Sequence, residues 1–253
     1  MGTIISIVNQ KGGVGKTTTA VNLTAALKQS KKKVLLCDFD PQANATSGMG
    51  VVKNGIRLSS YDIIINDADP KAAVVTTEYG DVIPSSAALS GAGVELVALE
   101  KREFRLKQAL DKVRDDYDCI LVDCPPSLEL LTLNALCAAD KILIPVQCEY
   151  YALEGLRDLM TTLRAVKRAM NPKLEIFGVL LTMFDGRTNL AVQVSEEVRR
   201  FFPEKVFSSV IPRNIRLSEA PSHGLPVLAY DKQSKGAESY YKLAAEILKK
   251  EGI

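Results

Sequence analysis

Cysteine is scarce in this chain, and its five residues, an odd number, include no Cys-x-x-Cys pair. Such a set argues against a disulfide framework and against a four-cysteine zinc site. Long hydrophobic runs are missing too, since no stretch approaches the ~20 apolar residues of a membrane-spanning helix. The first apolar run, Ile4–Val8, is too short for a secretory signal and leads into Gln10-Lys11-Gly12. These absences predict a protein of the reducing cytoplasm.

An excess of charge of one sign is also absent. Lys plus Arg number 32 and Asp plus Glu number 30, so the formal net charge is +2. This balance excludes nucleic-acid binding by bulk positive charge alone, although it allows a local basic patch. With 47% hydrophobic and 25% charged residues, the chain is too apolar for disorder. No linker, repeat or low-complexity tract interrupts it, so we expect a single domain over residues 1–253.

Apolar, β-branched runs alternate with helical patterns along the chain. Strands are expected at residues 4–8, 33–39, 81–84, 119–123, 141–147, 176–183 and 206–211. Helices are expected at residues 17–29, 104–113, 128–137, 153–170, 190–201 and 234–250, with loop and short helical pieces over 42–60. The alternation predicts an α/β fold, in which one doubly wound, mostly parallel sheet has helices on both faces. Ligands of such folds bind beyond the carboxyl ends of the strands.

A glycine-rich loop between the first strand and the first helix is the most specific signal. Residues 11–18 read Lys-Gly-Gly-Val-Gly-Lys-Thr-Thr, and the three glycines let the backbone aim N–H groups at a polyphosphate. The helix N-terminus adds partial positive charge. Lys16 is expected to reach the β- and γ-phosphates and the Thr17 hydroxyl to hold Mg²⁺. Gln10 stands where the strict P-loop pattern has its first glycine, and a second lysine, Lys11, stands at the entrance.

Carboxylates follow two of the expected strands. Asp38 and Asp40 flank Phe39, and Asp123 ends the apolar run that begins at Cys119. An apolar strand that delivers a carboxylate to Mg²⁺, usually through water, is the Walker B arrangement, so Asp123 is predicted to serve the metal. Asp38 is either a supporting carboxylate or a structural residue that caps the next turn.

The loop resembles the deviant Walker A motif of the ParA/MinD group of ATPases. Four further segments resemble the ParA/Soj branch of that group, namely Asp38–Thr46, Asp123–Ser127, Gln147–Gly155 and Ile211–Ser222. The resemblance runs from about residue 1 to residue 248, nearly the whole chain. It identifies the chain as a member of the P-loop NTPases and implies an ATPase that uses ATP and Mg²⁺ as a homodimer.

The resemblance also implies roles for individual residues. Lys11 would reach across the dimer to the partner's ATP, as an arginine finger does, and Asp40 would lie at the attacking water and near the metal. The implied catalytic residues are Lys11, Lys16 and Asp40, and the implied magnesium residues are Thr17, Asp40 and Asp123. The implied ATP contacts are Lys11, Gly12, Gly13, Val14, Gly15, Lys16, Thr17 and Thr18, with Pro212 and Asn214 at the adenine.

A further implication is a partition switch in the cytoplasm, associated with the nucleoid when ATP is bound. The ATP-bound dimer would hydrolyse ATP slowly and bind duplex DNA without sequence preference, and Arg187, Arg213 and Arg216 match the family's basic positions best. Residues 183–220 hold six Lys or Arg and five Asp or Glu, so a DNA site must be a spatial cluster spread over two subunits. With no helix-turn-helix expected before the loop, a ParB-type centromere-binding partner would recognise sequence. The cargo, chromosome or plasmid, is left open.

Three other functions share parts of this pattern. A MinD-type membrane-positioning ATPase needs a basic amphipathic C-terminal helix, whereas residues 240–250 carry a narrow apolar stripe suited to docking on the domain. An iron–sulfur carrier of the nitrogenase iron-protein type needs shared cysteines, and Cys124 has no second cysteine in a matching glycine-rich context. A nucleotide-gated scaffold without catalysis would not require the complete set of Lys16, Thr17, Asp40 and Asp123.

Overall fold

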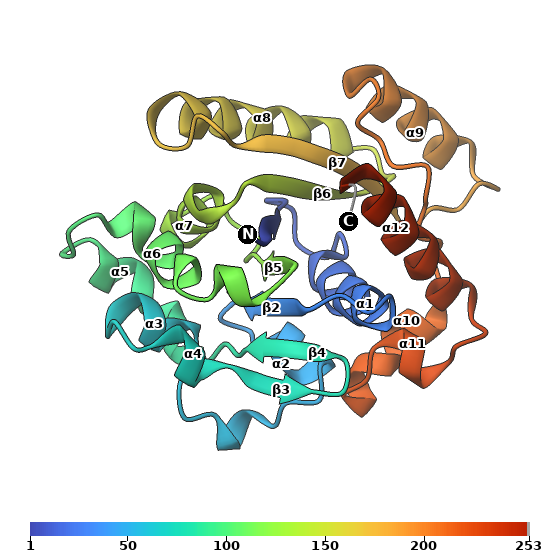
Figure 1. The fold of residues 1–253 in the computed structure, drawn as a ribbon. Coiled ribbons are helices and arrows are strands. Elements are labelled where there is room, and N and C mark those ends of the chain that lie inside the picture. The colour runs from blue at the N-terminus through green and yellow to red at the C-terminus, as the bar shows by residue number, and fades with distance from the viewer. Residues whose placement is uncertain (252–253) are drawn as a thin grey trace.

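The computed structural model describes residues 1–251, and within them seven strands form one sheet in the order β3–β4–β2–β5–β1–β6–β7 (Figure 1). Every neighbouring pair is parallel except β3 and β4. The expected α/β fold with a mostly parallel sheet is therefore confirmed. The strands are β1 Thr3–Ile7, β2 Val34–Asp38, β3 Val75–Thr77, β4 Gly80–Ile83, β5 Cys119–Asp123, β6 Lys141–Gln147 and β7 Glu175–Thr182.

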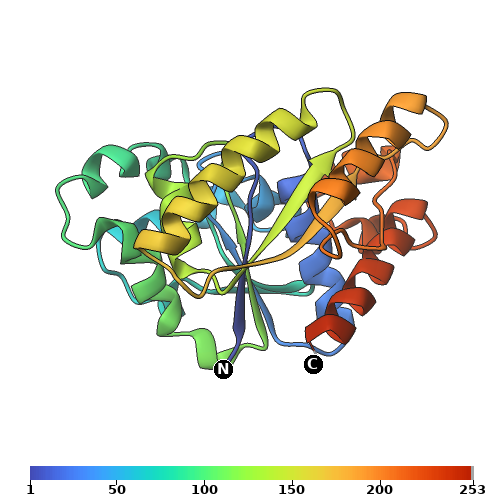
Figure 2. The same cartoon turned by 90° about the horizontal axis from the view of Figure 1, so that it is seen from above.

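Helices cover both faces of the sheet because the strand side chains alternate between two apolar clusters. Ile4 of β1 packs in the cluster under α3 to α9, whereas Ile5 and Ile7 pack in the cluster under α1, α2 and α10 to α12. Figure 2 shows the green helices on one side of the strands and the blue and red helices on the other. The helices are α1 Lys16–Gln29, α2 Asn44–Gly48, α3 Ser60–Ile65, α4 Pro70–Ala73, α5 Ala92–Leu96, α6 Arg105–Asp111, α7 Leu130–Ala138, α8 Ala152–Ala169, α9 Asn189–Phe201, α10 Ile215–Glu219, α11 Val227–Tyr230 and α12 Lys235–Glu251.

The prediction of a strand at residues 206–211 is wrong. This segment lies beside β7 but joins it through an isolated bridge rather than a continuous ladder. The N–H groups of Ser208 and Ser209 donate instead to the carboxylate of Glu246 on α12, at 2.7 and 2.8 Å. Phe207 and Ile211 still donate to carbonyls of β7, but Glu246 takes two of the N–H groups between them and interrupts the ladder. The apolar pattern alone could not indicate this.

The region between residues 60 and 96 holds most of the elements that we did not expect. It contains α3, α4, α5 and β3, each of three to six residues. Elements this short contain less than two turns or two repeats of the strand period, so their apolar pattern is not distinctive. They lie toward the β4 edge of the sheet, and the glycine-rich loop is not part of them.

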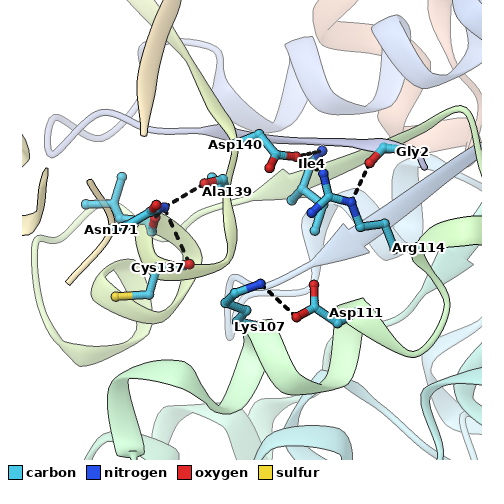
Figure 3. Close-up of polar contacts among 10 residues, drawn as sticks. Gly2, Ile4, Lys107, Asp111, Arg114, Cys137, Ala139, Asp140 and Asn171 are labelled. Atoms are coloured by element: carbon cyan, nitrogen blue, oxygen red, sulfur yellow. Dashed lines mark hydrogen bonds and ion pairs between the residues drawn. The ribbon is translucent and has the colours of Figure 1, made fainter. Parts of the chain in front are cut away.

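Figure 3 shows a polar cluster that includes Gly2, Ile4, Arg114 and Asp140, which lie at or shortly before the amino ends of β1, β5 and β6. The Asp140 carboxylate accepts a hydrogen bond from the Ile4 N–H at 2.8 Å and forms an ion pair with Arg114. Arg114 also donates to the Gly2 carbonyl at 2.6 Å. These bonds fasten the start of β1 to the segments that precede β5 and β6.

Candidate nucleotide-binding site

The glycine-rich loop lies between β1 and α1, at the carboxyl edge of the sheet. Gly13 and Gly15 have φ angles of +73° and +88°, a region in which a side chain is strained. Gly15 directly precedes α1, whose first turn has neither a side-chain cap nor an acidic residue. The N–H groups at this helix end are therefore left for an anion. The Thr182 hydroxyl at the end of β7 donates to the Val14 carbonyl at 2.8 Å and fastens the loop.

The two lysines of the loop point to different partners. Lys16 is buried, and its ammonium donates to the Lys11 carbonyl at 3.0 Å. Burial lowers the pKa of Lys16, and the negative charge of Asp123 partly offsets this by raising it. Lys11 instead directs its ammonium to Glu149, with Nζ 3.0 Å from Oε2. Lys16 thus lies within the loop, as expected for a phosphate-binding lysine, whereas Lys11 faces the segment that follows β6.

Asp123 is the most unusual carboxylate of the described chain. It is fully buried, and neither oxygen has a hydrogen-bond partner among residues 1–251. Burial raises its pKa well above the usual range, the nearby Asp38 raises it further, and Thr17 and Lys16 oppose the shift. An unpartnered buried carboxylate is costly, and a divalent cation beside Thr17 would satisfy it. The site therefore fits Mg²⁺.

The described residues contain no group of three or more His, Cys, Asp or Glu side chains that could hold a metal ion by itself. A cation at Asp123 would therefore complete its shell with the Thr17 hydroxyl, water and phosphate oxygens. Mg²⁺ commonly binds in this way, keeping several waters and taking substrate phosphates as ligands.

Asp38 and Asp40 have different surroundings at the end of β2. The Asp38 carboxylate is fully buried and accepts from the Thr46 N–H and hydroxyl, both at 2.7 Å, and from the Asp40 N–H at 3.2 Å. Burial raises its pKa to about 6, although the bonds from Thr46 lower it. Asp40 is 8% exposed and accepts from the Gln42 N–H at 3.0 Å. Asp38 therefore organises the turn, while Asp40 keeps one carboxylate oxygen for other groups.

A cavity of about 260 Å³ lies beside the loop on the side of β7. Pro212 and Asn214 line it together with Gly15 and Thr18, so residues expected at the adenine and at the phosphates share one cavity. Asn214 Oδ1 accepts from a backbone N–H of α10 at 3.0 Å, which leaves its NH₂ group as a donor. Two further lining residues, Thr182 and Tyr240, lie far from the loop in the chain, so no local motif indicates them.

Two of the three arginines expected at DNA, Arg187 and Arg213, lie on adjoining loops that are joined by the bridge between Phe184 and Pro212. Arg213 also lines the cavity, and the third arginine, Arg216, lies on α10. Two of the three are already paired. Arg187 makes two contacts with Asp185, at 2.8 and 2.7 Å. Arg216 pairs with Glu219 at 2.8 Å and with Asp231 at 3.2 Å, whereas exposed Arg213 has no ion pair among the described residues.

Three features define a P-loop nucleotide-binding protein. They are a glycine-rich loop between a buried strand and an uncapped helix, a buried lysine within that loop, and a buried aspartate at the end of the neighbouring strand. The family described as AAA domain matches residues 2–176. The sporulation initiation inhibitor protein Soj of Bacillus subtilis is 57% identical over 98% of this chain and 98% of that protein. The chromosome partitioning protein ParA of Myxococcus xanthus is 53% identical over 99% of this chain and 89% of that protein.

The same fold recurs in a crystal structure of cobyrinic acid a,c-diamide synthase from Mycobacterium smegmatis with bound ADP and magnesium. That structure is 35% identical, has a TM-score of 0.87 and matches 98% of this chain and 95% of its own. With these identities over almost its full length, the chain belongs to the ParA/Soj family of partitioning ATPases.

Proposed function

We propose that this chain is a Mg²⁺-dependent ATPase, acting as one domain, that forms a homodimer around ATP and binds duplex DNA without sequence preference in that state. It hydrolyses ATP slowly, and a ParB-type centromere-binding partner stimulates hydrolysis and so releases it from DNA. The cycle moves a chromosome or a plasmid. Two relatives, Soj at 57% identity and ParA at 53%, support a role in partition. The diamide synthase structure is only 35% identical, so its name gives less support to a synthase activity.

The buried, unpartnered carboxylate of Asp123 is the observation that carries the ATPase proposal. Mg²⁺ neutralises charge that develops on the transferred phosphoryl group. In the proposed site Thr17 and Asp123 hold the cation, Asp123 acting through water. Lys16 and the N–H groups of α1 bind the phosphates, and Pro212 and Asn214 bind the adenine. Asp40 orients the attacking water from its turn at the end of β2.

Lys11 serves the other subunit's ATP in this proposal. An ammonium supplied in trans stabilises negative charge on the γ-phosphoryl group during transfer, so hydrolysis requires the dimer. The dependence couples the nucleotide state to assembly, which a long-lived switch needs.

The alternative functions have less support. The apolar stripe of α12 is covered by the body of the protein, since Tyr240, Leu243 and Ile247 are each at most 1% exposed. A stripe that is already packed is not free to enter a membrane interface, as the MinD-type alternative requires. No helix of the described residues has the length and apolar character to span a bilayer. Cys124 is fully buried, so it is not placed to share a cluster with a second subunit.

DNA binding through Arg213 is testable because this arginine is exposed and forms no ion pair among the described residues, although it lies close enough to Asp185 to lower the pKa of that carboxyl. We expect Arg213→Ala to weaken binding of the ATP-bound protein to random duplex DNA. The slope of log affinity against log salt should fall by about 0.9 for each lost phosphate contact. Fluorescence anisotropy at several salt concentrations measures both quantities, and an ATP titration checks that the neighbouring adenine site is intact.

The matched control is Arg168→Ala, which removes an exposed arginine on α8 that does not line the nucleotide cavity. It should leave the affinity and the slope unchanged. If Arg213→Ala has the same slope as the unmodified protein, Arg213 does not contact DNA phosphates.

A further inference from the structure

The ion pair between Lys11 and Glu149 joins the phosphate loop to the segment between β6 and α8. The Glu149 carboxylate is held in place by the Gln147 amide on its other oxygen, and the Glu149 N–H donates to the Gln147 carbonyl at 2.9 Å. The side chains of Lys11 and Glu149 are 37% and 47% exposed. The pair can therefore open into solvent without unfolding its surroundings.

The backbone of Lys11 is fixed independently of its side chain. Its N–H donates to Asn9 Oδ1 at 3.0 Å, and its carbonyl accepts from the Lys16 ammonium at 3.0 Å. Asn9 in turn donates to the Pro145 carbonyl at 2.7 Å. Release of the Lys11 side chain from Glu149 thus changes only side-chain rotamers, and the loop that would bind phosphate keeps its shape.

We propose that Glu149 is a positioning residue that holds Lys11 within its own subunit before ATP binds, and so sets how readily two copies associate. The inference rests on the proposed role of Lys11 across the dimer. One ammonium cannot stay 3.0 Å from Glu149 and also reach a phosphate of the other subunit. Each dimer that uses both lysines must therefore break two such pairs, one in each copy.

The strength of the pair suits a restraint that ATP can overcome. Partly exposed ion pairs are weak, so breaking two of them would raise the dimer dissociation constant by roughly 2- to 30-fold. A triphosphate carries several negative charges and competes effectively for the same ammonium. The restraint therefore suppresses association without nucleotide and yields when ATP is present.

The test uses Glu149→Gln, which keeps the shape of the side chain and removes its charge. The matched control is Glu154→Gln, the same change at an exposed residue in the first turn of α8. The first readout is the rate at which an amine-acylating reagent modifies Lys11 in the nucleotide-free protein, followed by peptide mass spectrometry. The second is the dimer dissociation constant with a non-hydrolysable ATP analogue, from sedimentation velocity at about 0.05 and 0.5 M salt.

We expect Glu149→Gln to accelerate acylation of Lys11 and to tighten the dimer by about 2- to 30-fold at low salt. The tightening should shrink at high salt, where the ion pair of the unmodified protein is screened. Glu154→Gln should change neither readout. If Glu149 had only a structural role, Glu149→Gln would not tighten the dimer in a way that high salt abolishes.

Two results would overturn the inference. Unchanged acylation of Lys11 would mean that Glu149 does not hold it, whatever the function of the lysine. Faster acylation with an unchanged or weaker dimer would mean that the pair exists but does not restrain association. Failure of the proposed function has a different signature, because Lys11→Ala would then form the ATP-dependent dimer as well as the unmodified protein does.

Discussion

Lys16→Ala should lose ATP affinity by at least about 100-fold. The ammonium of Lys16 lies within the loop, and its hydrogen-bond acceptor among the described residues is the Lys11 carbonyl. An ammonium has three N–H donors, so the β- and γ-phosphates would add charge-assisted hydrogen bonds beside that acceptor, each of which is worth about 1.5–3 kcal/mol. Alanine supplies neither bond. Isothermal titration calorimetry with ATP and Mg²⁺ measures the loss directly.

A control separates this loss from a change in folding. Lys28→Ala removes an exposed lysine from the last turn of the same helix, α1, and should bind ATP with unchanged affinity. Both variants should unfold at similar temperatures without nucleotide, because removing Lys16 also removes the cost of burying its charge. ATP binding by Lys16→Ala with near-normal affinity would place the phosphates elsewhere.

Asp40→Ala should keep ATP binding and lose turnover. The Asp40 carboxylate is not part of the glycine-rich loop, so affinity should stay within a few-fold of the unmodified protein. Loss of a group that orients and activates the attacking water lowers the rate by about 10²- to 10⁴-fold. The variant should therefore accumulate as an ATP-bound dimer, visible as a persistent larger species in sedimentation velocity.

Asp111→Ala is the matched control for this prediction, since Asp111 lies at the end of α6 and its one ion pair within the described part of the chain is with Lys107 on the same helix. It should hydrolyse ATP at the normal rate. A normal rate in Asp40→Ala would mean that another group, or water alone, performs the step assigned to Asp40.

The parts of the fold that could be predicted are those that depend on local sequence. The strand from Thr3 to Ile7, the glycine turn and the helix from Lys16 form one continuous segment, so apolar period and glycine positions together specify them. The segment at 206–211 could not be predicted in the same way. Two of its backbone N–H groups bond to Glu246, which lies 37 residues beyond Ser209 in the chain.

The site shows the same division between local and distant information. The carboxylates were found because they directly follow apolar strands, and the structure brings Asp123 beside Lys16 and Thr17. The two roles considered for Asp38 could be told apart only by its bonds to Thr46 and to the turn. The partner of Lys11, Glu149, lies 138 residues away, so no local pattern indicates the pair.

The most direct test of the partition switch is binding of the purified chain to random duplex DNA with ATP, with ADP and without nucleotide, at low and moderate salt, beside Lys11→Ala. We predict binding with ATP only, a steep loss of affinity as salt rises, and no binding by Lys11→Ala in any nucleotide state. If no nucleotide gives DNA binding at either salt concentration, or if Lys11→Ala binds as well as the unmodified chain, the proposed switch is contradicted.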